Sequence, residues 1–213
     1  MIKPMTKALI AAGLLSASVV AQAGLSANIG ATSDYIFRGV NLSNGVGMMG
    51  GVDYEADNGI YVGAWGIGFD DGDTNEFEYD LYGGYAGEVG DLSYSVGYAG
   101  YFYDEADIEF HELNFNFGYE FLSLEVTFGT EDDGGYDDGI DDDYTYVALT
   151  GEYEGAYLTY GSFGKDYDGD FVELGYGTTF QGLDMGVAYV NADDDLSSPE
   201  DTVYVTISKT FDF

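Results

Sequence analysis

The sequence predicts an all-β protein, an up-and-down antiparallel transmembrane β-barrel of about twelve strands that follows a cleaved signal peptide. Two patterns after residue 23 predict this fold. Apolar and polar residues alternate with a period of two, and tight turns alternate with longer acidic loops. In addition, no apolar run after residue 23 approaches the ~18 residues that a membrane-spanning helix requires. With 46% hydrophobic and 17% aromatic residues, the chain has enough apolar side chains to fold despite its charge.

The first segment has the features of a secretory signal peptide. Lys3 and Lys7 precede an apolar run over residues 8–20, and small residues flank Gln22 at its end. A basic start, a short apolar run and a small-x-small site are typical of export through a Sec-type signal. We therefore expect residues 1–23 to be removed and residues 24–213 to form the barrel with its acidic extracellular loops. The alternative is that residues 8–20 form a buried helix.

Charge and composition exclude several classes of protein. Aspartate and glutamate number 40 against 5 lysines and arginines, which gives a formal net charge of −35. A polyanion of this kind repels nucleic acid, so no nucleic-acid partner is expected. The chain has no cysteine. Disulfides, thiolate zinc sites and cysteine catalysis are therefore excluded.

The alternation assigns the strands. Leu113, Phe115 and Phe117 alternate with Asn114 and Asn116, and the other runs repeat this pattern. Successive side chains of a strand point to opposite faces, so each run has one apolar and one polar face. Two runs have large side chains on both faces, which leaves the strand count open by two. We expect strands near 25–40, 46–56, 59–69, 76–87, 91–103, 109–120, 122–130, 143–153, 156–163, 170–180, 182–191 and 201–213.

The connections between these runs alternate in length. Tight turns fall at 57–58, 88–90, 121, 154–155 and 181–182. Longer acidic loops fall at 70–75, 104–107, 130–142, 164–168 and 192–200. Antiparallel neighbours joined in this way form a meander with all its long loops on one side. An even number of strands then leaves both termini on the turn side, the periplasmic side.

A soluble sandwich also alternates apolar and polar residues, but further features favour a membrane barrel. The polar faces are rich in Gly, Ser, Thr and Asn and suit a wet interior. Closure of the sheet into a barrel gives every backbone amide and carbonyl a hydrogen-bond partner, which the hydrocarbon of a bilayer cannot provide. Aromatic residues also mark the ends of the apolar face, as in barrels with aromatic girdles. These are Phe37, Phe77, Phe110 and Phe128 on the loop side, and Tyr85, Tyr119, Tyr153, Phe180 and Phe213 on the turn side.

Several motifs occur in an order that resembles one family. They are the motif SDYIFRGV at 33–40, GGVDY at 50–54, GIYVGAW at 59–65 and EYDLYGGY at 78–85. Together they resemble the TorF-type porins. The resemblance implies a barrel in the outer membrane of a Gram-negative bacterium, a porin function, and no catalytic residues. The C-terminal Phe213 is similar to the signal that the barrel-assembly machinery reads, although Lys209 interrupts the alternation before it.

The inward faces of the strands are predicted to be acidic. Carboxylates that line a pore attract cations, so a channel of passive diffusion for small solutes is expected to prefer cations. Arg38 is expected within a strand and paired with inward carboxylates, either as a constriction residue or as a structural bridge. The residues assigned to the pore by their parity are Asp34, Arg38, Glu78, Asp80, Glu112, Glu125, Glu152, Glu173 and Asp184.

The acidic loops partly resemble calcium-binding loops, although none fits the twelve-residue EF-hand pattern. Charge runs are usually solvated loops. The alternative is that weakly bound calcium or magnesium bridges the carboxylates to one another or to lipopolysaccharide phosphates; no other cofactor is expected. The candidate residues are Asp132, Asp133, Asp137, Asp138, Asp141, Asp142, Asp143, Asp166, Asp168 and Asp170.

An enzyme is not expected. Hydrolases in outer-membrane barrels need a nucleophile beside a histidine base. The single histidine, His111, lies on the apolar face near the loop rim, and Thr130 is expected opposite it. Three classes remain: a diffusion channel, a structural or adhesive barrel that does not conduct, and an exported soluble binder. The sequence identifies neither a solute nor an oligomeric state.

Overall fold

The computed structural model describes residues 24–104, 108–132, 142–196 and 201–213. All regular structure in this part of the chain is β-strand, and no helix in it is long and apolar enough to cross a membrane. The predicted signal peptide, residues 1–23, lies outside the described residues. The strands are β1 Gly24–Thr32, β2 Ile36–Phe37, β3 Val40–Asn41, β4 Gly47–Glu55, β5 Ile60–Asp70, β6 Asn75–Val89, β7 Leu92–Tyr103, β8 Glu109–Tyr119, β9 Leu122–Asp132, β10 Asp142–Tyr153, β11 Ala156–Lys165, β12 Asp170–Phe180, β13 Leu183–Ala192 and β14 Asp201–Asp212.

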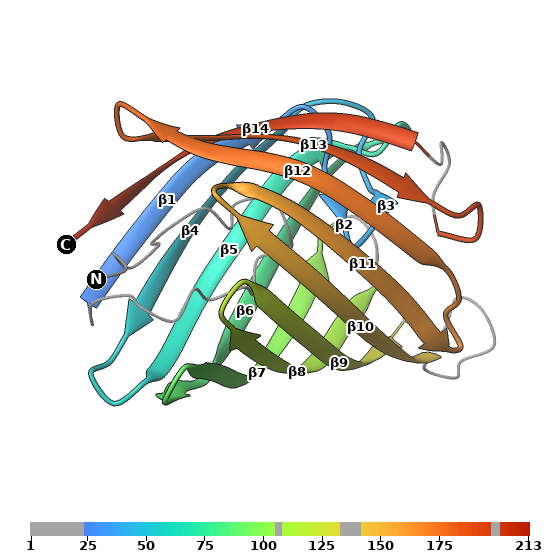
Figure 1. Cartoon of the computed structure of the whole chain (residues 1–213). Helices are drawn as coiled ribbons and strands as arrows, with labels where there is room; N and C mark the ends of the chain where they lie inside the picture. The colour runs from blue at the N-terminus through green and yellow to red at the C-terminus, as the bar shows by residue number, and fades with distance from the viewer. Residues whose placement is uncertain (1–23, 105–107, 133–141, 197–200) are drawn as a thin grey trace.

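Twelve of these strands form a closed antiparallel barrel in the order β1-β14-β13-β12-β11-β10-β9-β8-β7-β6-β5-β4. Each barrel strand pairs with its neighbours along the chain, and β1 closes the ring by pairing with both β4 and β14. Figure 1 shows the tilted strands and both termini at the same end of the barrel. The prediction of a twelve-stranded meander is confirmed.

Three two-residue turns share one backbone conformation. Both central residues have positive φ in Arg38-Gly39 (48° and 86°), Glu154-Gly155 (52° and 86°) and Gln181-Gly182 (53° and 76°). This is the type I′ geometry, whose twist matches that of the flanking strands, and it favours glycine at the second position. Two of these turns join barrel strands as predicted. The third, Arg38-Gly39, makes an additional hairpin.

The predicted first strand, 25–40, is wrong beyond Thr32. Strand β1 ends there, and the chain leaves the wall as residues 33–46, which we call the inner hairpin. Its two short strands pair as Ile36↔Asn41 and Phe37↔Val40, around the Arg38-Gly39 turn. The reason is local: the positive φ values of that turn reverse the chain, which a continuous strand does not allow. In Figure 1, β2 and β3 are drawn within the outline of the barrel, away from the termini.

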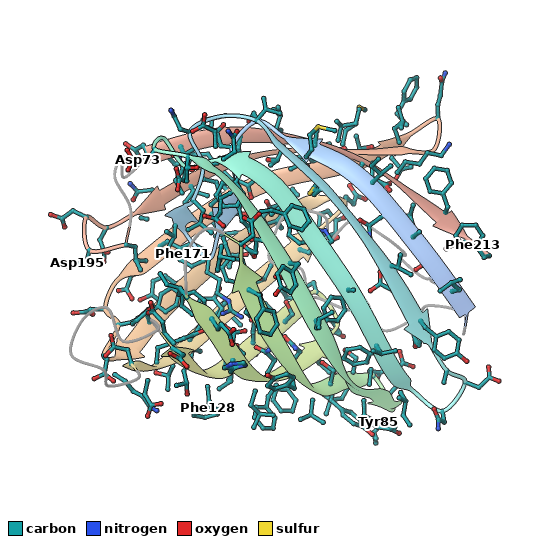
Figure 2. The ribbon with its side chains drawn as sticks, turned by 180° about the vertical axis from the view of Figure 1, so that it is seen from behind. Asp73, Tyr85, Phe128, Phe171, Asp195 and Phe213 are labelled. Carbon is teal, nitrogen blue, oxygen red and sulfur yellow. The ribbon has the colours of Figure 1, made fainter. Side chains whose placement is uncertain are left out.

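The outer surface of the barrel is apolar. Figure 2 shows Phe128 and Tyr85 on the outside of the wall. Two expected girdle residues are exceptions. Phe110 points inward, with its ring 6.4 Å from that of Tyr144, and Phe37 belongs to the inner hairpin, 5.6 Å from the ring of Tyr101. The exposed apolar side chains include Ile29, Val52, Val62, Leu81, Tyr98, Leu113, Leu124, Leu149, Leu158, Leu174, Val187 and Val205. A surface of this extent on one protein indicates contact with lipid.

A charge placed on this outer surface is expected to destabilise the barrel according to its depth in the bilayer. Leu174 lies in the middle of β12 and is 55% exposed, whereas Val203 lies near the loop end of β14 and is 63% exposed. We expect Leu174→Arg to lower the free energy of unfolding by about 2–4 kcal/mol and Val203→Arg by about 0–1 kcal/mol. Urea titration of the barrel in phospholipid vesicles measures both. Equally small losses of the free energy of unfolding in the two variants would show that the wall does not face acyl chains.

Candidate functional site

The inner hairpin connects β1 to β4 and is held inside the barrel by a set of hydrogen bonds at its base. The amide of Leu42 donates to the carbonyl of Tyr35 (2.9 Å), and the amide of Tyr35 donates to the hydroxyl of Ser43 (2.6 Å). The amide of Asn44 donates to the carbonyl of Asp70, at 2.6 Å. The hairpin therefore has a defined position and is not a loose loop.

Arg38, at the turn of the inner hairpin, is the centre of the site. Its guanidinium donates to both oxygens of Glu112, one of them at 3.1 Å, and to Glu125 Oε1 at 2.8 Å. The rings of Phe37 and Tyr146 lie 4.8 and 4.4 Å from its Cζ. Arg38 is only 8% exposed. A buried guanidinium held by two carboxylates and two aromatic rings joins the hairpin firmly to β8 and β9.

The Glu112 carboxylate has further partners. The hydroxyl of Tyr101 donates to its Oε2 at 2.9 Å, and that of Tyr144 donates to its Oε1 at 2.6 Å. Both oxygens also accept from Arg38. A fully buried carboxylate needs such partners, because an unpaired one carries a large desolvation cost.

The base and tip of the hairpin contact opposite walls. At the base, the Tyr35 hydroxyl donates to Glu78 Oε1 at 2.7 Å, and its ring lies 6.2 Å from that of Trp65. At the tip, Gly39 faces Phe171, and a Cβ on Gly39 would lie 2.6 Å from the Phe171 ring. Figure 2 shows Phe171 inside the barrel. The hairpin therefore extends across the interior from β6 to β12.

The seven carboxylates assigned to the pore on barrel strands share the parity of the buried side chains of their strands. Glu78, Asp80, Glu112 and Glu173 are buried, and Glu125, Glu152 and Asp184 are partly exposed. Asp34 and Arg38 lie in the inner hairpin, so the expectation of Arg38 within a strand is corrected to a turn. The hairpin brings Arg38, Glu112 and Glu125 together. Asp184, which accepts from Thr179 at 2.5 Å, and Glu152 lie nearer the turn side, away from this cluster.

Tyrosine hydroxyls are the partners that parity alone did not predict. Glu173 Oε1 accepts from Tyr157 at 2.6 Å and from Tyr204 at 3.1 Å. Tyr82 donates to Asp53. Tyr82 alternates in phase with Glu78 and Asp80 on β6, and that shared parity is a sequence signal for it. Strands β11 and β14 contain none of the carboxylates assigned to the pore, so Tyr157 and Tyr204 have no such signal.

The loop-side half of the interior is packed rather than wet. Tyr146, Phe171, Val190 and Tyr204 are buried in one cluster, against which Ile36 of the hairpin packs. The turn-side half is lined by smaller polar side chains, among them Ser95, Thr150 and Thr159. The expected watery bore therefore does not continue through the loop-side half, because aromatic residues fill that half around the hairpin.

The acidic loops are described only in part. Asp133, Asp137, Asp138 and Asp141 lie outside the described residues, whereas Asp132, Asp142, Asp143, Asp166, Asp168 and Asp170 lie at the loop ends of β9 to β12. Asp143 pairs with Lys165 at 3.3 Å, and its amide donates to Asp166 at 3.0 Å. Within the described ranges, no group of three or more His, Cys, Asp or Glu side chains is arranged to hold a metal ion.

One loop carboxylate is held by the backbone. Asp71 Oδ1 accepts from the amides of Asp73 (2.8 Å) and Thr74 (2.7 Å), and these bonds lower the pKa of its carboxyl. The arrangement is an Asx turn, which stabilises the tight loop between β5 and β6. Asp73 and Asp195 lie at the same end of the barrel in Figure 2, opposite Phe213.

His111 lies on the outer face, as predicted, and pairs in register with Thr130. Its Nδ1 is 2.7 Å from the Tyr98 hydroxyl, and its Nε2 is 3.5 Å from Glu109. The ring stacks on that of Tyr98. These contacts give His111 a structural role at the rim.

Comparison with solved structures finds barrels of the same kind at low identity. The KdgM porin is 10% identical, and the match covers 88% of this chain and 99% of that one, with a TM-score of 0.55. A structure from a study of the in-meso crystallization of membrane proteins is 10% identical over 89% of this chain and 83% of that one, with a TM-score of 0.58. At these identities the likeness shows the fold alone.

A longer outer membrane protein also matches, with less similarity. The outer membrane protein opdK from Pseudomonas aeruginosa is 12% identical, with a TM-score of 0.42; the match covers 79% of this chain and spans 58% of the opdK chain. A search of curated proteins found no match. The TorF-type resemblance stays a prediction.

A family model described as a bacterial protein of unknown function (Gcw_chp) matches residues 16–212, so the chain belongs to the Gcw_chp family.

Proposed function

We propose that this barrel is a porin-like channel of a Gram-negative outer membrane, in which the inner hairpin forms the constriction and small cationic or neutral solutes diffuse passively. It has no catalytic role in this proposal. The observation that carries it is the closed twelve-stranded wall with an apolar outer face and carboxylates on its inner face. Such a wall separates lipid from a polar path.

Several features support the outer-membrane location. The fold is that of the KdgM porin, and the exposed apolar side chains fit an acyl-chain environment. Phe213 is 79% exposed, and its amide donates to the carbonyl of Leu25 at 2.9 Å, so the C-terminal residue continues the closing seam with its ring accessible to the assembly machinery. Export through a signal peptide at residues 1–23 belongs to the same proposal. The other partners are outer-membrane lipid and lipopolysaccharide.

The preference for cations follows from the charges of the inner face. Seven carboxylates predicted to face inward lie there, and the inward guanidinium of Arg38 is already paired with Glu112 and Glu125. Glu152 and Asp184 are partly exposed on the turn-side half. Uncompensated carboxylates along a confined path lower the energy of a cation and raise that of an anion.

A salt gradient across a planar bilayer tests this selectivity. The reversal potential of the folded barrel in potassium chloride is expected to have the sign of cation preference. Glu152→Gln together with Asp184→Asn should move it towards zero, while Asp57→Asn, in a turn outside the barrel interior, should leave it unchanged. An anion-selective reversal potential would contradict the proposed role of the inward carboxylates.

Release of the inner hairpin is expected to widen the path. Arg38→Ala leaves Glu112 buried without its cation, which should lower the free energy of unfolding by about 3–5 kcal/mol and raise the unitary conductance. The matched control is Lys165→Ala, whose exposed pair with Asp143 contributes about 0–1 kcal/mol. Urea titration and single-channel recording measure the two effects. An unchanged conductance in a folded, destabilised Arg38→Ala variant would show that the hairpin does not restrict flow.

A second candidate function is a structural or adhesive barrel that does not conduct, with cation-binding acidic loops at its surface. The packed loop-side half of the interior favours it, since Tyr146, Phe171 and Tyr204 are each less than 5% exposed around the hairpin. The bilayer recordings of the wild type and of Arg38→Ala distinguish the channel from the non-conducting barrel. Zero unitary conductance, in both the folded wild type and the Arg38→Ala variant, would select this second function.

The acidic loops are proposed to bind divalent cations that bridge them to lipopolysaccharide phosphates. Asp142, Asp143, Asp166 and Asp168 present carboxylates on neighbouring strand ends. Calorimetry with calcium should give fewer bound ions when these four are changed to asparagine, and the same number for Asp57→Asn on the turn side. No calcium heat and no thermal shift in the wild type would end this proposal.

A further inference from the structure

Two carboxyl groups of β6 are buried without enough partners. Glu78 and Asp80 are each 1% exposed. Both oxygens of Asp80 and Oε2 of Glu78 accept no hydrogen bond from any described residue. Glu112 and Glu173 lie in the same interior and accept bonds from Arg38 or from tyrosine hydroxyls. These three unpartnered oxygens therefore distinguish the Glu78 and Asp80 pair from Glu112 and Glu173.

The unpartnered oxygens lie together. Residues 78 and 80 are on the same face of β6, and the two carboxyl groups are within hydrogen-bonding reach of each other. The Tyr35 hydroxyl is bonded to the other oxygen of Glu78, Oε1, and does not reach the unpartnered one. Since carboxylates have no proton to donate, their three free oxygens repel one another unless a positive species lies between them.

Among the described residues no basic side chain is left to supply that charge. After residue 23 the sequence contains only Arg38, Lys165 and Lys209 as basic residues besides His111. Arg38 bonds Glu112 and Glu125, and Lys165 pairs with Asp143 at the loop end. Lys209 lies over the ring of Phe211 on β14. None of the basic side chains that the structure describes therefore balances Glu78 and Asp80.

We infer that Glu78 and Asp80 bind a divalent metal cation of the hard, oxygen-preferring type, such as Ca²⁺. Two carboxylates match the charge of one divalent ion and offer it three oxygens. The remaining positions fall to water or to a neighbouring hydroxyl such as that of Tyr103, which adjoins Glu78. This site is distinct from the acidic loops. It does not depend on whether the barrel conducts, because it is defined by the packing of the inner hairpin against β6.

The single tryptophan of the chain is a built-in probe of this site. Trp65 on β5 is the direct cross-strand partner of Asp80 on β6, and it is 6% exposed. Paired positions of antiparallel strands have their Cβ atoms about 4.5–5.5 Å apart. Tb³⁺, a luminescent substitute for Ca²⁺, emits by energy transfer only when it lies close to an excited indole. Ions bound at the distant loops are therefore not detected with excitation at 295 nm.

The experiment titrates Tb³⁺ into the full-length barrel, folded in detergent both with and without the ion, and records Trp-sensitised emission. Saturable emission that Ca²⁺ displaces is expected. Asp80→Asn and Glu78→Gln should each weaken binding by about tenfold or more. The matched control is Glu173→Gln, which removes a buried carboxylate that already has hydroxyl partners and should leave the emission unchanged. Trp65→Phe should abolish the emission.

Three results would overturn the inference. The first is no sensitised emission in the wild type under either folding condition, which would mean that a shared proton balances the pair. The second is a Tb³⁺ affinity, read from the emission titration, that is equal in the wild type and in Asp80→Asn. The third is emission that excess Ca²⁺ does not displace. Heat-modifiable migration on an unboiled gel verifies that each variant is folded, and Glu78→Gln decides the question if Asp80→Asn does not fold. The Tb³⁺ titration does not use bilayer conductance, so its result is valid even if the barrel does not conduct.

Discussion

The structure depends on the closure of its sheet. In hydrocarbon, every backbone amide and carbonyl needs a partner within the protein, and an open edge of a sheet leaves a row of them unpaired. Strand β1 removes both edges at once by pairing with β4 on one side and with β14 on the other. Once the ring is closed, side chains of one parity face lipid and those of the other parity face inward, so the inward carboxylates of the wall owe their position to this closure.

The interior shows how a highly acidic chain buries carboxylates. Desolvation of a carboxylate is unfavourable unless hydrogen bonds or a cation replace water. Arg38 serves two of the inward carboxylates, and tyrosine hydroxyls serve Glu112, Glu173 and Glu78. The phenol is well suited to this role, because its ring packs into the apolar part of the interior while its hydroxyl donates to the acid. The abundance of tyrosine in this acidic sequence thus has a structural reason.

The sequence was sufficient for the wall of the barrel, since strict alternation predicts strands, faces and turn positions wherever the wall is regular. It also placed Glu78, Asp80 and Glu173 on the inner face, because parity depends only on the period of two. It was insufficient where the chain leaves the wall. Residues 33–40 keep an alternating pattern, so the pattern alone predicts an extension of β1 in place of the inner hairpin. The Arg38-Gly39 pair was the available sign, since it has the same X-Gly form as the turns at Glu154-Gly155 and Gln181-Gly182.

Tertiary contacts could not be predicted in the same way. The bonds from Arg38 to Glu112 and Glu125 join residues far apart in the chain, and no local pattern specifies them. The packing of Phe171 against Gly39 likewise depends on how the hairpin crosses the lumen. Phe37 contacts Tyr101 inside because it leaves the wall with the hairpin. Phe110 contacts Tyr144 inside because it shares the parity of the inward Glu112 on β8, so its assignment to the outer girdle is wrong on the alternation itself.

The inner hairpin is tethered at both ends, because Thr32 and Gly47, where it leaves and rejoins the wall, are themselves a paired couple of β1 and β4. A segment anchored at a single rung of the ladder cannot diffuse away when it is displaced. Its effective concentration at its own docking surface stays high, since the entropy lost on return is only that of a short loop. A displaced hairpin therefore returns to its own contacts more readily than an untethered segment would.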